Sequence, residues 1–341
     1  MTDVQIDWRA VVDEAVRRRK ADGLSQRDLA ALAGVSAPTV NQFEQGEINL
    51  RFERVVAILD ALGLFLQPGR SDNLQSFAHA ARQRWEKLVA NLPPDSPSRQ
   101  PFGHSQQAYS LELHDPSPSL SRLRETLARA PHTSGWPPFW VPAREPLKPV
   151  IRDGVIECWL GKPEVDRMFP DAAHTDFWQI GRGGSAYLQR GYQEDGPDLQ
   201  PGTIFDVTLP IWRTGEVLLH AAWLAREFSG SSGQKIRFSA KYTGLAGREL
   251  FSWAKPLIHI GLPQQYRART DAVDLNIDTT VLEVEENLHS PVSRALSPLY
   301  EQFGGFGLPP QLVVSQIEEL LQEVSRREGD GRKARAHTKS I

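Results

Sequence analysis

The chain has 341 residues and a formal net charge of −3 at pH 7, and 24% of its residues are charged. This length favours two domains of ordinary core size, and the acidic balance excludes a protein that coats nucleic acid without regard to sequence. The single cysteine, Cys158, excludes an intramolecular disulfide and argues against a structural zinc cluster, so we expect no metal and no cofactor.

The first segment of the chain predicts a soluble protein that begins with a helix. The first ten residues lack a basic segment followed by an apolar run, and no stretch of 18 apolar residues occurs, so we expect a cytoplasmic protein without a membrane partner. Helical spacing then places five apolar side chains on one face: Trp8, Val11, Val12, Ala15 and Val16. Four basic residues at positions 17 to 20 suit the end of the helix dipole, or could meet a DNA backbone.

The stretch LSQRDLAALAG predicts a short helix over residues 25–33. Ser25 stands as an N-cap, and Asp28 three residues later can complete a capping box. Gly34 follows the last apolar position, where a helix favours a glycine.

A second short helix follows at once and ends at Gly46. Ser36 is its expected N-cap, and Pro38 lies in the first turn, where its missing N–H costs little. Two helices joined by about three residues must cross steeply, as in a helix-turn-helix. With Val40 and Phe43 facing inward, the outer side chains are those of Ala37, Thr39, Asn41, Gln42 and Gln45. Asn and Gln can pair with an adenine edge, and small Ala or Thr can contact a thymine methyl group.

This stretch resembles the helix-turn-helix of the Xre/Cro family of bacterial and phage regulators. The matching residues are Leu24, Ser25, Gln26, Leu29, Ala30, Gly34, Val35, Ser36, Val40, Phe43, Glu44 and Gly46. The resemblance covers residues 8–66 and implies that Gln26 contacts a phosphate. It also implies that the base-reading side chains are Ala37, Pro38, Asn41 and Gln42, to which the outward position adds Thr39. Pro38 departs from the polar residue often found at its position.

Residues 50–62, LRFERVVAILDAL, predict a further amphipathic helix through Phe52 and the apolar residues that follow it. Arg51 and Arg54 lie at its beginning, where regulators of the resembled type touch phosphate. The full set of expected phosphate contacts is Gln26, Arg27, Ser36, Arg51 and Arg54. Residues 1–91 hold 12 basic and 12 acidic side chains, so useful DNA affinity should depend on base contacts and dimerisation.

The region after the DNA-binding domain, which we place at residues 1–70, predicts a helix and then a linker. Residues 71–91 carry an apolar stripe that suits packing against a second copy, against the C-terminal domain, or within its own core. Residues 92–118 are rich in Pro, Ser and Gln, and we interpret them as the linker, within which LELH could add a short strand.

Residues 119–325 predict a tryptophan-rich domain that mixes short strands with helices. We therefore expect an α+β protein, in which an all-α helix-turn-helix domain precedes a larger mixed α/β domain with a mainly antiparallel sheet. The expected strands are 155–161, 176–180, 186–192, 203–212, 235–244 and 266–275, and the expected helices are 119–130, 214–228, 278–303 and 309–327. Residues 326–341 hold six basic and two acidic residues and are expected to form a disordered basic tail.

Several side chains of this second domain permit an enzymatic hypothesis, which we weigh against ordinary structural roles. Asp166, Asp171, His174 and Asp176 could serve a DNA-tethered nuclease, but their spacing matches no metal motif and fits solvated loops. The glycine-rich 181–185 suits a hairpin turn, because a phosphate cradle needs a strand followed by a helix.

The remaining candidates for chemistry are weaker still. Asp206 and Glu216 could form a carboxylate pair, Cys158 suits a buried thiol, and His220 suits an interior histidine. We therefore expect no enzyme and no catalytic residue.

The tryptophans suggest a binding role. A possible ligand pocket would be formed by Trp136, Trp140, Trp159, Trp178 and Trp212, although indoles also serve as core residues. The expected function is a transcriptional regulator, by family habit a repressor, that binds a palindromic operator in double-stranded DNA as a homodimer. Its C-terminal domain would dimerise or sense a small-molecule or protein effector. Two alternatives stay open: an antitoxin-like or phage-defence-associated protein whose C-terminal domain binds a protein or nucleic acid, and the DNA-tethered enzyme.

Overall fold

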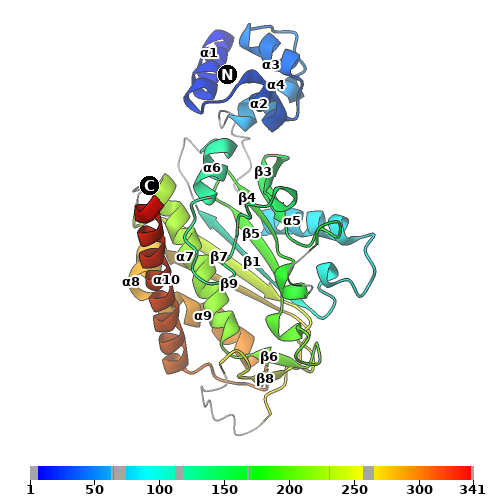
Figure 1. Cartoon of the computed structure of the whole chain (residues 1–341), viewed down its shortest axis with the longest axis vertical. Coiled ribbons are helices and arrows are strands. Elements are labelled where there is room, and N and C mark those ends of the chain that lie inside the picture. Colours follow the sequence, from blue (N-terminus) through cyan, green and yellow to red (C-terminus); the bar gives the residue numbers. More distant parts are fainter. Residues whose placement is uncertain are drawn as a thin grey trace, which may run out of the picture.

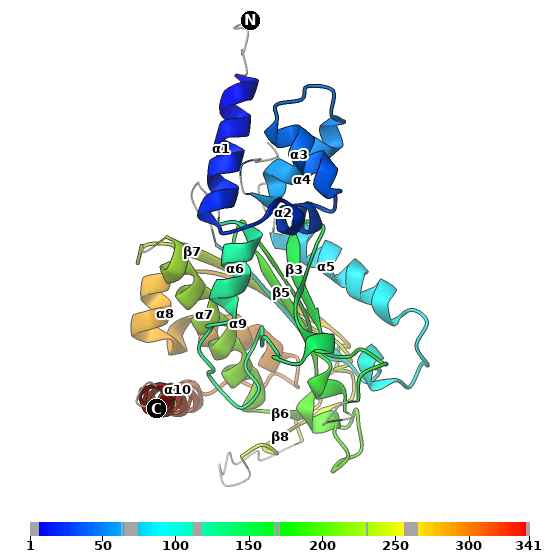
Figure 2. The same ribbon diagram turned by 45° about the horizontal axis from the view of Figure 1, so that its top comes forward.

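The computed structural model describes residues 7–62, 64, 74–111, 118–166, 169, 171–229, 231–255 and 265–338, the last eleven of these by their backbone alone. A small helical module forms one end of the molecule, and a larger α+β domain forms the rest (Figure 1). Figure 2 shows the same two parts with the module brought forward. In the described part of the chain, no helix is both long enough and apolar enough to cross a membrane.

The N-terminal module consists of four helices: α1 (Trp8–Ala21), α2 (Gln26–Ala33), α3 (Ala37–Glu44) and α4 (Phe52–Ala61). One residue of each helix shows how they meet, since Val12, Leu29, Val40 and Ile58 are all fully buried in a common core. The module therefore has a hydrophobic core that is separate from that of the larger domain.

Seven antiparallel strands make the main sheet, in the order β2-β3-β4-β5-β1-β7-β9. The strands are β1 (His104–Leu111), β2 (Val150–Arg152), β3 (Val155–Trp159), β4 (Phe177–Gly181), β5 (Ala186–Gly191), β7 (Lys235–Tyr242) and β9 (Val273–Thr280). A separate parallel pair is formed by β6 (Ile204–Asp206) and β8 (Glu249–Phe251). Together with the helices, this sheet confirms the α+β expectation.

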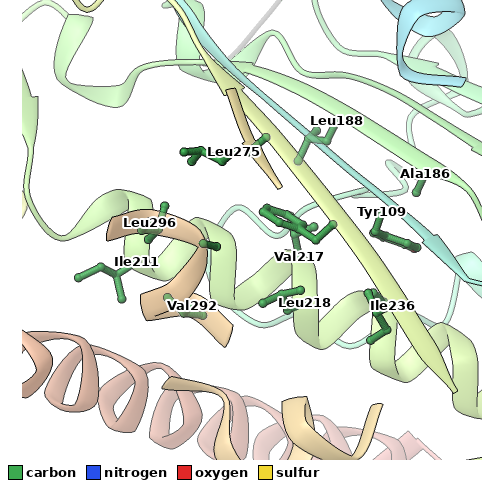
Figure 3. Close-up of a cluster of buried hydrophobic side chains, with 14 of the residues drawn as sticks. Tyr109, Ala186, Leu188, Ile211, Val217, Leu218, Ile236, Leu275, Val292 and Leu296 are labelled. Carbon is green, nitrogen blue, oxygen red and sulfur yellow. The ribbon is translucent and has the colours of Figure 1, made fainter. Parts of the chain in front are cut away.

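Helices cover both faces of the sheet. The larger core lies under α6 (Leu120–Leu127), α7 (Leu209–Phe228), α8 (Val281–Asn287), α9 (His289–Glu301) and α10 (Pro310–Thr338). Figure 3 shows side chains of α7 and α9 facing those of the strands, among them Val217, Leu296 and Ile236. On the opposite face α5 (Leu74–Val89) packs Trp85 near Phe177. Short 3-10 helices occupy Pro97–Arg99, Glu145–Leu147, Ala172–His174 and Gln193–Asp195.

The structure differs from the sequence-based expectation in the region between the two parts. Residues 92–118, interpreted as a linker, contain β1, which lies inside the sheet and pairs with both β5 and β7. Part of that stretch, residues 112–117 with most of LELH, lies outside the described residues. Helix α5 belongs with the sheet, because its buried side chains contact β1, β4 and β5.

Three further boundaries also differ. The expected strand 203–212 ends at Asp206, whose Oδ1 accepts hydrogen bonds from the amides of Thr208 and Leu209 and so starts α7. The expected helix 278–303 begins at Val281, because β9 continues to Thr280 and this threonine caps α8. Residues 326–338, expected to be disordered, continue α10, and both Arg326 and Arg327 pair with Glu323 one turn earlier.

A buried ion pair ties together the loops at the far end of the sheet. Arg248 is fully buried, and its guanidinium donates to both carboxylate oxygens of Asp195, at 2.8 and 2.6 Å. The remaining donors reach the carbonyl oxygens of Phe102, Ile204 and Gly244. Every nitrogen of this guanidinium is therefore satisfied, which is the condition under which a buried arginine is stable.

Replacing Asp195 by alanine should lower the free energy of unfolding by about 3–5 kcal/mol, because Arg248 would be left buried without its counter-charge. Urea denaturation at neutral pH measures this change. The matched control is Asp198→Ala in the same loop, because Asp198 is exposed and its removal should change stability by less than about 0.5 kcal/mol. Equal losses for both variants would contradict a special role for the buried pair.

Candidate nucleic-acid interface

The turn before the second motif helix is set by local backbone chemistry. The Ser25 hydroxyl accepts the Asp28 amide at 3.1 Å, and Asp28 accepts the Ser25 amide at 2.9 Å, so the predicted capping box is present. Gly34 ends α2 with φ at +64°, a left-handed conformation that favours glycine. These two features fix where α2 begins and ends, and hence the angle at which α3 leaves it.

Helix α3 is held by its inward face and by its start. Val40 and Phe43 are fully buried, and the Ser36 hydroxyl accepts the Thr39 amide at 3.3 Å. From α1, Trp8 donates its indole N–H to the Gly46 carbonyl oxygen at 3.1 Å and meets the Phe43 ring edge to face. The helix that would enter a groove is therefore fixed against the module core at both ends.

Three of the predicted base-reading residues face solvent. Pro38, Asn41 and Gln42 are exposed in the whole chain, so the C-terminal domain leaves this surface uncovered. Thr39 was predicted to face outward, but only 3% of it is exposed, and its hydroxyl lies 2.8 Å from that of Ser36. Ala37 is half-buried and packs against the module core. The outward surface of α3 is thus narrower than the sequence suggested.

A half-buried polar cluster connects the two motif helices with each other and with α1. Glu44 accepts hydrogen bonds from Arg19 at 2.5 and 3.0 Å and from Gln26 at 2.8 Å. Burial opposes the ionised form of Glu44, but these hydrogen bonds prevail and lower its pKa below the ordinary value. Nε2 of Gln26 carries a second hydrogen, which suits the phosphate contact predicted for this residue.

The other predicted phosphate contacts all lie at the surface of the module. Arg27, Arg51 and Arg54 are exposed, and Ser36 is exposed at the start of α3. Sequence reasoning missed two large apolar side chains nearby, because Ile48 and Phe52 are 79% and 73% exposed. Phe52 was expected on the inner face of its helix, but it is the first residue of α4 and precedes the part of that helix that packs.

The five tryptophans do not form one pocket. Trp178 is fully buried and donates to the Trp140 carbonyl oxygen at 3.1 Å, while Trp136 stacks at a tilt on Trp140 with ring centroids 4.9 Å apart. Trp159 lies on the other face of the sheet, in the core under α5. Trp212 donates to Gln316 of α10 and lies under the Lys255 ammonium. A single pocket formed by all five is therefore not present: Trp136, Trp140 and Trp178 lie together, whereas Trp159 and Trp212 lie in two other parts of the fold.

The acidic side chains considered for catalysis are engaged by separate partners. Asp171 accepts from His174 at 2.7 Å, and buried Asp176 accepts from Arg190 at 2.6 Å. Asp166 is exposed at the surface. Within the ranges that the structure describes, no three His, Cys, Asp or Glu side chains converge in a way that could hold a metal ion.

The remaining candidates for chemistry, the carboxylates of Asp206 and Glu216 and the side chains of Cys158 and His220, are also held by structural partners. Asp206 accepts backbone amides at the start of α7, whereas Glu216 accepts from Arg213 and Thr133. Burial raises the pKa of the Cys158 thiol, which donates to a backbone carbonyl oxygen. Burial lowers the pKa of His220 to about 3, and its Nδ1 lies 2.9 Å from the Tyr109 hydroxyl.

A small cavity of about 30 Å³ lies between the sheet and the start of α7. Arg190, Arg213 and Glu194 are among the residues that line it. Burial raises the pKa of Glu194 to about 7, although one of its oxygens accepts the Asp206 amide at 2.9 Å. The volume suits one or two water molecules and is too small for a metabolite.

Comparison with known proteins identifies the N-terminal module alone. A family model described as Helix-turn-helix matches residues 17–64. This match confirms the resemblance drawn from Leu24 to Gly46 and leaves the C-terminal domain without a family. No curated protein and no solved structure matches the chain.

Replacing Glu194 by glutamine should change how stability depends on pH. The pKa of Glu194 is about 7 in the folded chain against an ordinary 4.5, so the folded state binds more protons between these values. As the pH rises from about 4.5 to about 7, ionisation of Glu194 therefore lowers the free energy of unfolding of the native protein by up to about 3 kcal/mol. The Gln variant should gain stability relative to the native chain over that range.

Urea titrations at several pH values from 4 to about 8 test this expectation. The control Glu301→Gln changes an exposed glutamate on α9 and should leave the pH profile unaltered. Parallel profiles for the native chain and Glu194→Gln would show that Glu194 does not titrate in this window.

Proposed function

Because the N-terminal module is a helix-turn-helix of the Xre/Cro-like type, we propose that the protein is a sequence-specific transcriptional regulator of bacterial or phage type, acting in the cytoplasm. The observation that carries this proposal is the exposed end of α3. Pro38, Asn41 and Gln42 face solvent on a helix whose other side is locked into the core. Such a helix can enter a major groove and present amide groups to base edges.

We further propose that the regulator binds a palindromic operator as a homodimer. Residues 1–70 hold 9 basic and 10 acidic side chains, so one module has little non-specific attraction for DNA. Two modules spaced by about 34 Å would contact successive major grooves on one side of the duplex and combine their affinities. The C-terminal domain supplies the dimer contacts, and repression follows where the operator overlaps a promoter.

The C-terminal domain is proposed to act by binding rather than by catalysis. Support comes from its carboxylates, since Asp171, Asp176 and Glu216 are each held by a structural partner. A carboxylate held in this way has fewer oxygen lone pairs free to accept a proton from a substrate. An effector bound by this domain would act through the geometry of the dimer.

Capture of genomic fragments by the purified full chain, followed by sequencing, tests the proposed function. The native protein should recover a short palindrome, and Gln42→Ala should weaken operator binding by about 1–3 kcal/mol and relax the preference at one base pair in each half-site. The matched control is Gln45→Ala, because Gln45 is also exposed but caps the far end of α3. That variant should recover the native palindrome.

Arg51→Ala separates backbone contacts from base reading. Arg51 is exposed at the start of α4, so its loss should weaken all DNA sequences similarly and reduce the salt dependence by about one phosphate contact. Fluorescence anisotropy on operator and random duplexes at several salt concentrations measures this. If Gln42→Ala and Arg51→Ala had the same effect on both duplexes, the assignment of Gln42 to base reading would fail.

A further inference from the structure

The helix-turn-helix module rests on the hairpin tips of the C-terminal sheet. Asp60 at the end of α4 pairs with Arg182 in the turn between β4 and β5. Gly154, with φ at +78° in the turn between β2 and β3, lies so close that a Cβ there would come 3.1 Å from the Asp60 carboxylate. The glycine-rich turn at 181–185 therefore serves as a support for the module.

Beside this support, the end of α1 and helix α6 enclose a cleft of about 520 Å³. Figures 1 and 2 both show α6 directly beneath the module. This volume lies in the range of small-molecule sites. Ala21 is the single apolar residue among those that line the cleft, so the walls do not favour an apolar ligand.

Arginines dominate both walls of the cleft. Arg17 and Arg18 come from α1, Arg122 comes from α6 and Arg129 from the turn just after it, and Asp22 and Glu125 are the acidic residues among the lining. The lining therefore carries four guanidinium groups and two carboxylates. Two of these guanidinium groups have carboxylate partners: Arg17 pairs with Glu14 at the surface, and Arg18 lies 3.8 Å from Asp22. A phosphate group must compete with these pairs, of which the exposed Arg17–Glu14 pair is worth little and the Arg18–Asp22 contact is long.

The guanidinium group of Arg122 is available to a ligand. It lies over the Phe228 ring at 5.7 Å, and no carboxylate pairs with it in the described part of the chain. Stacking on a ring leaves the N–H groups at the edge of a guanidinium free to donate. Arg129 is 3.8 Å from Glu227, a long contact that a stronger anion can replace.

We propose that this cleft binds a small molecule with at least two phosphate groups, of nucleotide size, which bridges α1 and α6. Guanidinium groups recognise phosphate through paired, charge-assisted hydrogen bonds. Four guanidinium groups on two opposite walls offer more hydrogen-bond donors than one phosphate group can accept, which favours a ligand with two or more phosphates. A bound ligand links the module to the sheet domain at a second place besides Asp60. It thereby fixes the direction in which α3 points. This regulatory role rests on the proposed function, whereas the binding itself does not.

Isothermal titration of the full-length protein with pyrophosphate and with ATP, in about 150 mM salt, tests the site. Both probes should bind, and Arg17→Gln and Arg122→Gln should each weaken binding about tenfold. The matched control is Arg124→Gln, because Arg124 is exposed on α6 but does not line the cleft. Absence of binding by the native protein, or equal weakening by Arg124→Gln, would overturn the proposal.

Anisotropy on the captured operator tests the coupling separately. ATP should change operator affinity about threefold or more in the native protein and leave it unchanged in Arg122→Gln. If Arg122→Gln alone weakens DNA binding without added phosphate, these arginines contact DNA and the small-molecule site is wrong. If the protein binds pyrophosphate but no DNA, the proposed function fails and the site stands. If ATP binds without changing operator affinity, the regulatory role fails.

Discussion

The pairing of β1 with both of its neighbours holds the C-terminal domain together. Strands β2 to β5 pair in antiparallel succession, and β7 pairs with β9. Among the strands that the structure describes, these two groups are joined through β1 alone. Gln107 shows the arrangement, since it lies opposite Leu188 on one side and Ala240 on the other. Without β1 each group would present an open edge of unpaired backbone amides and carbonyls, which is a site of aggregation. Folding of the domain therefore requires this contact between distant segments.

Sequence reasoning identified the helix-turn-helix because its signals are local. Ser25, Asp28 and Gly34 act within a few residues of themselves, so spacing alone predicts the helix ends. Strand β1 has no such local signal, because the strands with which it pairs, β5 and β7, lie far from it in the sequence. Within β1, Gln107 is buried, and its side-chain amide donates to the Tyr242 hydroxyl at 3.4 Å. A buried polar residue of this kind resembles a loop residue when only the sequence is read.

The same distinction explains for which residues of α3 the exposure was predicted correctly. Asn41 and Gln42 are exposed as expected, but Thr39 lies at the border of the inner face, where helical spacing alone does not separate inside from outside. For the tryptophans, composition shows their number and not their directions. Trp159 and Trp178 lie on the neighbouring strands β3 and β4, but at positions whose side chains point to opposite faces of the sheet. Trp159 therefore packs under α5, and Trp178 packs in the larger core.

The neutral module makes the regulator sensitive to geometry. A strongly basic module would hold DNA in many orientations, because attraction to phosphate depends little on the exact direction of a helix. Under the proposed function, most of the affinity comes from the short exposed end of α3, which would contact bases only when it points into the groove. A contact between the module and the sheet domain can favour or disfavour the orientation that binds DNA. If it changes the free energy of that orientation by about 1.4 kcal/mol, operator occupancy changes about tenfold at low protein concentration. The ion pair between Asp60 and Arg182 and the arginine cleft are placed where such a contact has the most effect, between the sheet domain and the module whose α3 is proposed to read the DNA.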